Sequence, residues 1–378
     1  DVGMVGAESE TSAGGGGGAG EGSQQQDHPT GTERQGGSEA GGYTHDGARG
    51  GSGLSRKQFY ASQLMNPEWM IDVPPRLLTD WYVIPRPEGR RCLVIASNLL
   101  TISRTRNGTI LHRFPSALPN GSRATGTGSD DSYCILDCIF HEADQVYYVL
   151  DLMCWKGYSL YDCTAEFRLF WVSSKLPESG ACDPPGPAHR YRFCPLPAYE
   201  CSAEGLHAAY ASPVPFTRDG MVLLNREAHY DLGLSPLVLL WKDAVCSQYF
   251  VDTDKDGVVP PHQIVLLRYQ QDGTVVTCDD PPIAMGCMPK DFQAKVPSLR
   301  TGMLLRFAIG EAGMVMVDGR PTAADILYLG PGNQRKGAAD SLTKIIFQYN
   351  ARRQPITIQE LAAGAVDDGE MDAEMRRC

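Results

Sequence analysis

Short apolar runs recur along the chain from about residue 80 onward and predict a protein built mainly of β-strands. Runs rich in β-branched and aromatic residues and bounded by Gly, Pro, Asp or Asn are typical of strands. They lie at Trp81–Ile84, Cys92–Ala96, Val146–Met153, Phe167–Trp171, Met221–Leu224, Pro236–Trp241, Ile264–Tyr269, Thr274–Thr277, Met303–Phe307 and Met314–Val317. Helical periodicity is weaker and is found at Lys57–Met70, Ser202–Ala211 and Ile358–Ala365. The pattern predicts an α+β fold with antiparallel sheets and flanking helices.

The same pattern divides the chain into segments. Of the 41 glycines, 18 lie in residues 1–53, where large apolar side chains are almost absent. Such a segment cannot bury enough surface to offset its chain entropy, so we expect a disordered arm over 1–56. Segments rich in Pro, Gly and Ser at 178–195, 254–263 and 278–299 predict surface loops. We expect a main domain over 57–253, a further β-rich segment over 254–350 that completes the sheet or forms a small barrel, and a short helix with an acidic tail over 351–378.

Composition narrows the possible functions. A net charge of -11 argues against a protein that coats nucleic acid along a broad basic face, but it allows a small pocket for one nucleotide. The 12 cysteines form no C-x-x-C pair, which argues against zinc ribbons and thioredoxin-like chemistry and favours buried thiols in a reducing compartment. No apolar run approaches 18 residues, and no basic-then-apolar signal pattern opens the chain, so we expect no membrane association.

Several blocks of sequence together carry a family resemblance. They are Gln63–Pro74, Asp80–Val83, Arg86–Ser97, Tyr133–Ile139, Tyr147–Gly157, Glu166–Leu176 and Asp219–Leu224. From about Tyr60 to Trp241, half of the chain, the sequence resembles the snurportins, adaptors for small nuclear RNA with a trimethylguanosine cap. The resemblance implies a fold similar to that of mRNA guanylyltransferases and polynucleotide ligases, that is, nucleotidyltransferase-like antiparallel sheets.

The enzymes of that fold use the lysine of a K-x-D-G-x-R motif as their nucleophile. The aligned hexamer here runs from Arg86 to Arg91, with Arg86 at the nucleophile position and Glu88 in place of Asp. A guanidinium stays protonated and cannot attack a phosphate as a neutral amine does, so we expect a binding module and not an enzyme. Two alternatives stay open: an active guanylyltransferase or ligase with its nucleophile moved to Lys156 or Lys242, and a scaffold that binds no nucleotide.

The chemistry of the cap indicates which residues to seek. Methylation at N7 makes the base cationic, which suits an aromatic face, and the bridging phosphates suit arginine. By resemblance, Trp69 and Pro67 belong to the cap site, with Pro67 replacing a serine of the family. Trp241 is the candidate for the main stacking residue, although it stands one position later than in the family pattern, and such a shift reverses the face of a strand. The resemblance further implies Arg90, Arg91, Cys92 and Arg106 around the phosphates.

Metal chemistry has weaker support in the sequence. Asp252–Gly257 resembles the opening of an EF-hand loop, but Gln263 stands where a bidentate carboxylate is needed and Pro260 interrupts the following helix. A turn between a strand at Tyr249–Val251 and the strand at Ile264–Tyr269 is the preferred interpretation. Asp137 and Asp151 are remnants of an enzyme metal site or make structural hydrogen bonds, and the second interpretation is favoured. We therefore expect no metal and no cofactor.

The family resemblance also implies transport partners. Snurportins present an Arg-rich N-terminal helix to importin-β, and the resemblance implies importin-β, an export receptor and shuttling between cytoplasm and nucleus. Before Tyr60 the basic residues are Arg34, Arg49, Arg56 and Lys57, which form no such helix. Either the helix lies upstream of Asp1 or the receptor is reached by another route. In the segment after residue 254, RNA contacts are suggested by three charged residues, Arg335, Lys336 and Lys344.

Overall fold

The computed structural model describes residues 55–126, 132–289, 291–292, 296, 298–317, 320–334 and 337–365. The chain divides into two compact units, 1–49 and 50–378, and every described residue belongs to the second. Most of the predicted disordered arm, the acidic tail beyond residue 365, and both Arg335 and Lys336 lie outside the described residues. Within the described ranges, no helix has the length and apolar character needed to cross a membrane.

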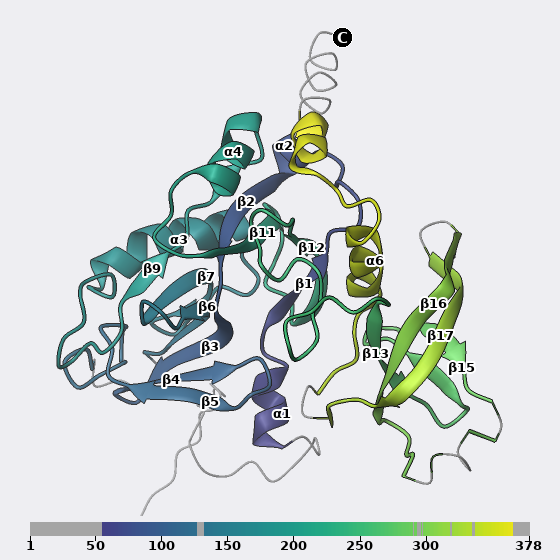
Figure 1. Ribbon diagram of the computed structural model, residues 1–378. Coiled ribbons are helices and arrows are strands. Elements are labelled where there is room, and N and C mark those ends of the chain that lie inside the picture. The colour runs from purple at the N-terminus through teal and green to yellow at the C-terminus, as the bar shows by residue number, and fades with distance from the viewer. Residues whose placement is uncertain are drawn as a thin grey trace, which may run out of the picture. The chain divides into compact units, whose positions relative to one another are not determined.

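Two sheets form the body that contains the predicted cap site (Figure 1). The first is five-stranded, in the order β1-β12-β11-β2-β10. Its strands are β1 (Met65–Trp69), β12 (Gly233–Trp241), β11 (Arg218–Asn225), β2 (Trp81–Pro87) and β10 (Tyr199–Glu200). β1 runs parallel to β12, whereas the other neighbours are antiparallel.

The second sheet is seven-stranded, in the order β5-β4-β3-β6-β7-β8, with β9 paired to β7. Its strands are β3 (Arg90–Ser97), β4 (Leu100–Thr105), β5 (Ile110–Phe114), β6 (Cys134–His141), β7 (Val146–Trp155), β8 (Tyr158–Ser159) and β9 (Phe193–Pro195). All pairings except β7 with β9 are antiparallel. The predicted α+β class with antiparallel sheets is confirmed.

A third sheet follows in the chain, in the order β15-β14-β13-β16-β17. It consists of β13 (Ile264–Tyr269), β14 (Thr274–Val276), β15 (Ala284–Cys287), β16 (Leu304–Val317) and β17 (Arg320–Pro331), all antiparallel. The two strands expected at 303–307 and 314–317 are a single strand, β16. Its pairing with β17 changes register between Ile309 and Met314, where two glycines interrupt the apolar run.

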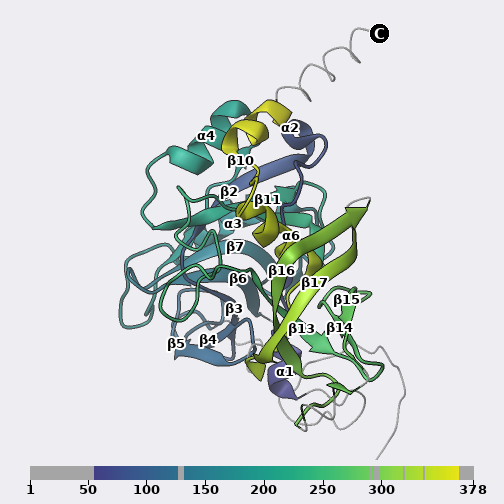
Figure 2. The ribbon, with the colours of Figure 1, turned by 45° about the vertical axis from the view of Figure 1, so that its right-hand side comes forward.

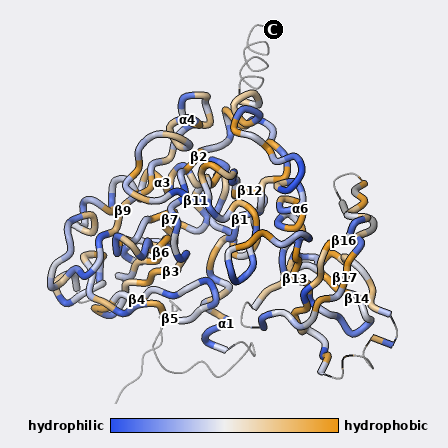
Figure 3. Tube along the Cα trace, in the orientation of Figure 1, coloured by the Kyte–Doolittle hydropathy of each residue, from blue (hydrophilic) through white to orange (hydrophobic). Residues whose placement is uncertain are grey.

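Most of the helices begin where a side-chain cap satisfies a free backbone N–H group, and the helix Leu77–Asp80 is the exception among those described. The helices are α1 (Arg56–Ala61), α2 (Leu77–Asp80), α3 (Ala165–Glu178), α4 (Ala203–Ala211), α6 (Leu342–Ala351) and a last helix at 358–365. The side chains of Thr164, Ser202 and Ser341 each accept a backbone N–H from the third residue of the helix that follows. The helices predicted over 202–211 and 358–365 are confirmed. α1 is mostly hydrophilic and buries no residue (Figure 3).

Two predicted elements are wrong, and both errors have a local cause. The helix expected over Lys57–Met70 ends at Ala61, because Pro67 favours extended backbone before it and β1 pairs with β12 instead. The strand expected at Phe167–Trp171 lies within α3. Ala165, Val172 and Leu176 recur there at helical spacing and are buried, while the aromatic rings that suggested a strand point partly outward.

The third sheet and its surroundings bring two further corrections. The segment 254–350, expected to consist of strands that complete the sheet or form a small barrel, also contains the helix α6. Tyr249–Val251 is not a strand, but the predicted turn is present, with Asp254 N–H donating to the carbonyl of Val258 at 2.8 Å. In Figures 1 and 2, α6 lies between β1 and the β16–β17 hairpin; its Ile345 packs into the core of the third sheet and its Phe347 contacts Trp69.

The two main sheets share one apolar core. Ile84, Val222 and Leu224 of the first sheet pack in the same cluster as Leu93 and Met153 of the second. A separate core lies on the other side of the second sheet and includes residues of α3. A further core on the first sheet includes residues of α4 and of the helix at 358–365. The shared cluster therefore lies between the two sheets, and it surrounds the candidate site.

Candidate functional site

A cavity of about 230 Å³ opens within the shared core of the two main sheets. Strand alternation produces its apolar wall, since β11 and β12 pair Val222 with Leu240 and Leu224 with Val238. The apolar lining residues are Met65, Pro67, Ile84, Leu150, Val222, Leu224, Val238 and Leu240. The charged ones are Arg86, Arg91, Arg106, Asp137 and Asp151. The cavity thus has apolar walls and a cluster of charged side chains, of which Arg106 is exposed to solvent.

Arg91 of β3 is held across the cavity by Asp137 of β6. Its Nε lies 3.0 Å from Asp137 Oδ1 and a terminal guanidinium nitrogen lies 2.5 Å from Oδ2, which is a bidentate pair. The hydroxyl of Tyr230 also donates to Asp137 Oδ2, at 2.8 Å. Burial by itself would lower the pKa of Arg91, but the Asp137 carboxylate outweighs it and raises the pKa. Arg91 is therefore a fixed cation.

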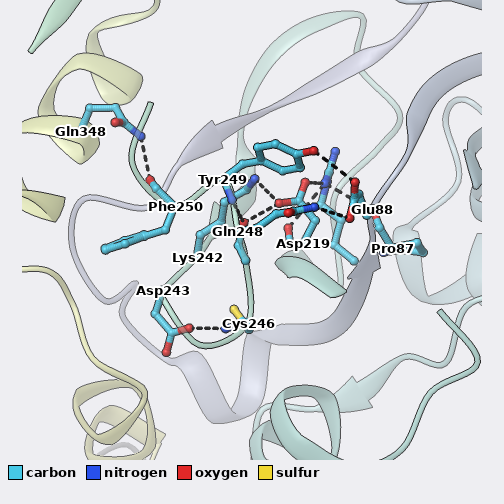
Figure 4. A network of polar contacts seen from close by, with 12 residues as sticks. Pro87, Glu88, Asp219, Lys242, Asp243, Cys246, Gln248, Tyr249, Phe250 and Gln348 are labelled. Atoms are coloured by element: carbon cyan, nitrogen blue, oxygen red, sulfur yellow. Dashed lines mark hydrogen bonds and ion pairs between the residues drawn. The ribbon is translucent and has the colours of Figure 1, made fainter. Parts of the chain in front are cut away.

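Arg86 of β2 belongs to a second network, centred on Asp219. Figure 4 shows Asp219 together with Lys242. One Asp219 oxygen pairs with Arg86, and the other accepts from Lys242 Nζ and from Ser247 Oγ, the latter at 2.5 Å. Burial lowers the pKa of both Arg86 and Lys242, and Asp219 only partly opposes this. Two cations thus share one buried carboxylate, which leaves this network with an excess positive charge.

Asp151 of β7 is paired with Arg168 of α3. The Arg168 side chain is fully buried, and its Nε and one terminal nitrogen lie 2.8 and 2.9 Å from the two Asp151 oxygens. Asp137 and Asp151 therefore each hold a guanidinium, so the favoured prediction that they make structural contacts is confirmed. Among the described residues, no group of three or more His, Cys, Asp and Glu side chains is arranged to hold a metal ion.

Arg106 is the cavity arginine for which no carboxylate pair is found in the described part of the chain. Burial at the cavity, together with the guanidiniums of Arg91 and Arg86, lowers the pKa of Arg106 to about 10, although the side chain keeps contact with solvent. The cavity and its ion-pair partners together hold five cationic side chains, Arg86, Arg91, Arg106, Arg168 and Lys242, and three carboxylates, Asp137, Asp151 and Asp219. This local excess of positive charge lies within a chain whose net charge is -11.

Of the residues predicted to form the cap site, three line this cavity, namely Pro67, Arg91 and Arg106. Arg90 does not, because it precedes Arg91 on β3 and points away, to an exposed ion pair with Glu142 at 2.8 Å. The Cys92 side chain lies on the same face of β3 as that of Arg90, turned away from the cavity, and it is fully buried in the core on the other side of the second sheet. Placing Cys92 beside the phosphates is wrong for this structure, since strand alternation turns its side chain away.

Trp69 lies at the end of β1, where its half-buried ring packs against the shared core of the two main sheets. The ring is 4.8 Å from the ring of Phe347, measured between centroids, with the planes tilted by 47°. The Lys242 amine lies 5.8 Å from the centre of the Trp69 ring. Trp69 therefore borders α6 and the Asp219 network and is not part of the cavity lining.

Trp241 is a core residue in this structure, so its assignment as the main stacking residue is wrong. Its side chain is fully buried among residues such as Leu77 and Trp81, and its indole N–H donates to the carbonyl of Ile356 at 3.0 Å. Leu240, one position earlier, faces the cavity instead. The one-residue shift noted in the sequence therefore reverses the face, as alternation requires.

The apolar wall and the ion-pair networks were not found from the sequence. The strand patterns at 221–224 and 236–241 contain the wall residues, but their common face depends on pairing between strands. Asp219 pairs with residues 133 positions before it and 23 positions after it, so no local motif marks the network. Together these features define an α+β domain with a positively charged, apolar-walled cavity between two sheets.

Comparison with known families gives this domain a more specific place. Residues 63–243 match the family described as Snurportin1, m3G cap-binding domain. The match confirms the resemblance to the snurportin family that the sequence blocks predicted. Every residue that lines the cavity lies within the matched region.

Among solved structures, the similar ones include DNA ligases. The ligase domain of LigD from M. tuberculosis is 12% identical, with a TM-score of 0.35 over 72% of this chain and 96% of that one. A mycobacterial DNA ligase D complexed with ATP and MES is 12% identical, with a TM-score of 0.32 over 74% and 99%. The Chlorella virus DNA ligase-adenylate is 10% identical, with a TM-score of 0.29 over 71% and 99%. Likenesses of this size support no statement about ligand or chemistry.

Proposed function

We propose that the cavity between the two sheets binds the 2,2,7-trimethylguanosine cap of small nuclear RNA without catalysis. The observation that carries the proposal is the excess of positive charge around an apolar-walled cavity. Arginine matches phosphate oxygens in geometry and charge, and Arg106 has no carboxylate pair in the described part of the chain. The cap supplies the phosphates, and its methyl groups match the wall of Leu240, Val222 and their neighbours.

The size and edges of the cavity support a small ligand. Ligand pockets commonly measure about 300–1,000 Å³, so about 230 Å³ suits one compact group and not a length of RNA. An N2 atom with two methyl groups has no proton left to donate, so an apolar wall is a better partner than a carboxylate. Trp69, at the edge of the cavity, offers an aromatic face to a cationic base.

The absence of catalysis is supported by the residue at the nucleophile position. Arg86 remains a guanidinium, and Asp219 holds it in an ion pair. Lys242 favours the enzyme alternative in one respect, because burial lowers its pKa and so favours the neutral amine. However, its amine is engaged by Asp219 and does not line the cavity. Incubation with labelled GTP or ATP should leave no covalent label, and a label on Lys242 would establish the alternative.

The transport role is the broader part of the proposal. The match to the snurportin family supports an adaptor for nuclear import of small nuclear ribonucleoproteins, with importin-β and an export receptor as partners and shuttling between cytoplasm and nucleus. A pull-down of the full chain by importin-β, with and without capped RNA, tests this part. Binding of capped RNA but not of importin-β would limit the function to cap recognition.

Titration with cap analogues tests the central proposal. The full chain is titrated with trimethylated, monomethylated and unmethylated cap dinucleotides, and binding is followed by calorimetry and by tryptophan fluorescence. We expect the trimethylated dinucleotide to bind most tightly, because its methyl groups gain burial against the apolar wall. If none of the three dinucleotides binds, the proposed function is refuted.

A further inference from the structure

Besides the cavity between the two main sheets, here called the cap cavity, the protein has a second concave site of about 700 Å³, which is formed by the part of the chain after residue 250. The loop at 251–263, the β16 strand near its glycines and the C-terminal end of α6 form it. Its polar lining includes Gln263, Tyr349, Arg352 and Arg353, and Glu311 is the acidic lining residue. Unlike the cap cavity, this groove is large enough for an extended ligand.

Two guanidiniums at the end of α6 give the groove its positive charge. Arg352 donates one terminal N–H to the carbonyl of Pro260 at 2.8 Å, while its buried Nε has no partner. Arg353 is exposed and lies 3.6 Å above the ring of Tyr349. In the described part of the chain, neither guanidinium forms an ion pair with a carboxylate. Asp252, which acts on Arg352 electrostatically, is itself paired with Lys344 at 3.1 Å.

Gln263 provides a second, independent sign of a ligand. The residue is only 5% exposed and lines the groove, and its Nε2 donates to the carbonyl of Ile345 at 2.8 Å. Its Oε1 is buried and accepts no hydrogen bond. Buried acceptors are normally satisfied, so a ligand with an N–H or O–H donor fits this position.

α6 connects the groove with the edge of the cap cavity. Phe347 on this helix contacts Trp69. The Gln348 side chain donates to the carbonyl of Phe250 (Figure 4) and accepts from the backbone N–H of Asp252. Arg352 follows Phe347 by five residues, which is about 7.5 Å along the helix axis. The groove therefore begins one or two helical turns from Phe347, the residue that contacts Trp69.

We propose that this groove binds ribonucleotides of the RNA strand that follows the cap. Arg352 and Arg353 contact backbone phosphates, a ribose 2′-hydroxyl or a base N–H donates to Gln263 Oε1, and an unstacked base rests on the Tyr349–Arg353 pair. This role rests on the proposed function, because the cap anchors the strand whose next nucleotides enter the groove. An acidic or phosphorylated peptide has similar charge, but the link to Trp69 through α6 favours RNA.

Binding measurements on the full chain test the proposal. The ligands are a trimethylated cap dinucleotide, the same cap followed by five further nucleotides, and the uncapped oligonucleotide with a 5′-hydroxyl. The variants are Arg352→Gln/Arg353→Gln and, in case the double variant folds poorly, the exposed single variant Arg353→Gln. Arg306→Gln is the matched control, since Arg306 is an exposed cation of the same third sheet that does not line the groove.

We expect the capped oligonucleotide to bind at least tenfold more tightly than the cap dinucleotide. The double variant should remove most of that gain and should lower the slope of log affinity against log salt by about 0.7 for each phosphate that it no longer binds. Its affinity for the cap dinucleotide, and every affinity of Arg306→Gln, should stay unchanged. Equal affinity for capped oligonucleotide and cap dinucleotide would overturn the groove proposal while leaving cap binding intact.

The uncapped oligonucleotide separates the two proposals. If cap dinucleotides fail to bind but the uncapped strand binds in an Arg352- and Arg353-dependent way, the groove proposal stands and the cap proposal falls. If a phosphoserine peptide competes for the two arginines and the oligonucleotide does not, the RNA assignment of the groove is refuted.

Discussion

Replacing Arg106 by glutamine should weaken cap binding without weakening the fold. In the ligand-free protein this cation lies among other guanidiniums, and burial together with Arg91 and Arg86 lowers its pKa to about 10. Its side chain keeps contact with solvent, so the repulsion is screened and is worth at most about 1 kcal/mol. Arg106→Gln should therefore leave the free energy of unfolding unchanged or raise it by up to about 1 kcal/mol.

The same change removes a cation that faces the ligand phosphates. A hydrogen bond to a charged group contributes about 1.5–3 kcal/mol, which corresponds to a roughly ten- to hundredfold loss of affinity. Stability is measured by urea denaturation, and affinity by calorimetry with the trimethylated cap dinucleotide. Arg106→Gln is thus expected to lower the affinity for the cap dinucleotide while leaving the free energy of unfolding unchanged or higher. A loss of affinity caused by unfolding would instead be accompanied by a lower free energy of unfolding.

Arg90→Gln is the matched control for this experiment. Arg90 lies on β3 beside the cavity residue Arg91, but its guanidinium points to Glu142 at the surface. The control variant removes the same charge from the chain. We nevertheless expect cap affinity to change by less than about twofold, because dissolved salt screens the interaction between an exposed charge and a distant ligand. Equal losses of affinity in Arg90→Gln and Arg106→Gln would refute a specific phosphate contact by Arg106. A destabilised Arg106→Gln protein would refute the electrostatic reasoning itself.

Two further predictions follow from the positions of Trp241 and His112. Trp241→Phe removes a buried hydrogen bond and some packing volume, so it should lower the free energy of unfolding by about 1–3 kcal/mol. Cap affinity should stay unchanged. A large loss of affinity in the folded variant would show that Trp241 does contact the cap. His112 lies on β5, where its Nδ1 is 2.7 Å from the Tyr147 hydroxyl. Burial, aided by Arg90, lowers the pKa of His112 below 6.5, so the unfolded chain takes up a proton at this residue first as the pH falls through 6.5. Stability should therefore decrease from pH 7.5 to pH 5.5, and urea denaturation of His112→Gln should show a smaller decrease; an identical decrease would contradict the assignment.

The contrast between sequence and structure is sharpest around the cap cavity. Alternation within Met221–Leu224 and Pro236–Trp241 was visible in the sequence, and so was the shifted position of Trp241. Which face of β12 points to the cavity depends on its pairing with β11 and β1, where the register with β1 shifts between Pro67 and Glu68. No local pattern contains that information, because it belongs to contacts between strands far apart in the chain.

The helix α3 shows the opposite case, in which the local signal was present but outweighed. Thr164 is a good N-cap, and Ala165, Val172 and Leu176 have helical spacing. The aromatic run from Phe167 suggested a strand because β propensity depends on context more than helix propensity does. The strand prediction assumes that these aromatic rings are buried, but Phe167 and Phe170 are exposed on the surface of the helix.

The sequence by itself determined the α+β class, most of the strands, the family of residues 63–243 and the loss of a lysine at the nucleophile position. These follow from local periodicity and from residue chemistry at fixed spacing. Only the tertiary structure decided that Arg86 and Lys242 share Asp219, that Leu240 and not Trp241 faces the cavity, and that Arg352 lies in a second groove. The physical reason is that burial, pairing and charge balance are properties of groups brought together from distant parts of the chain.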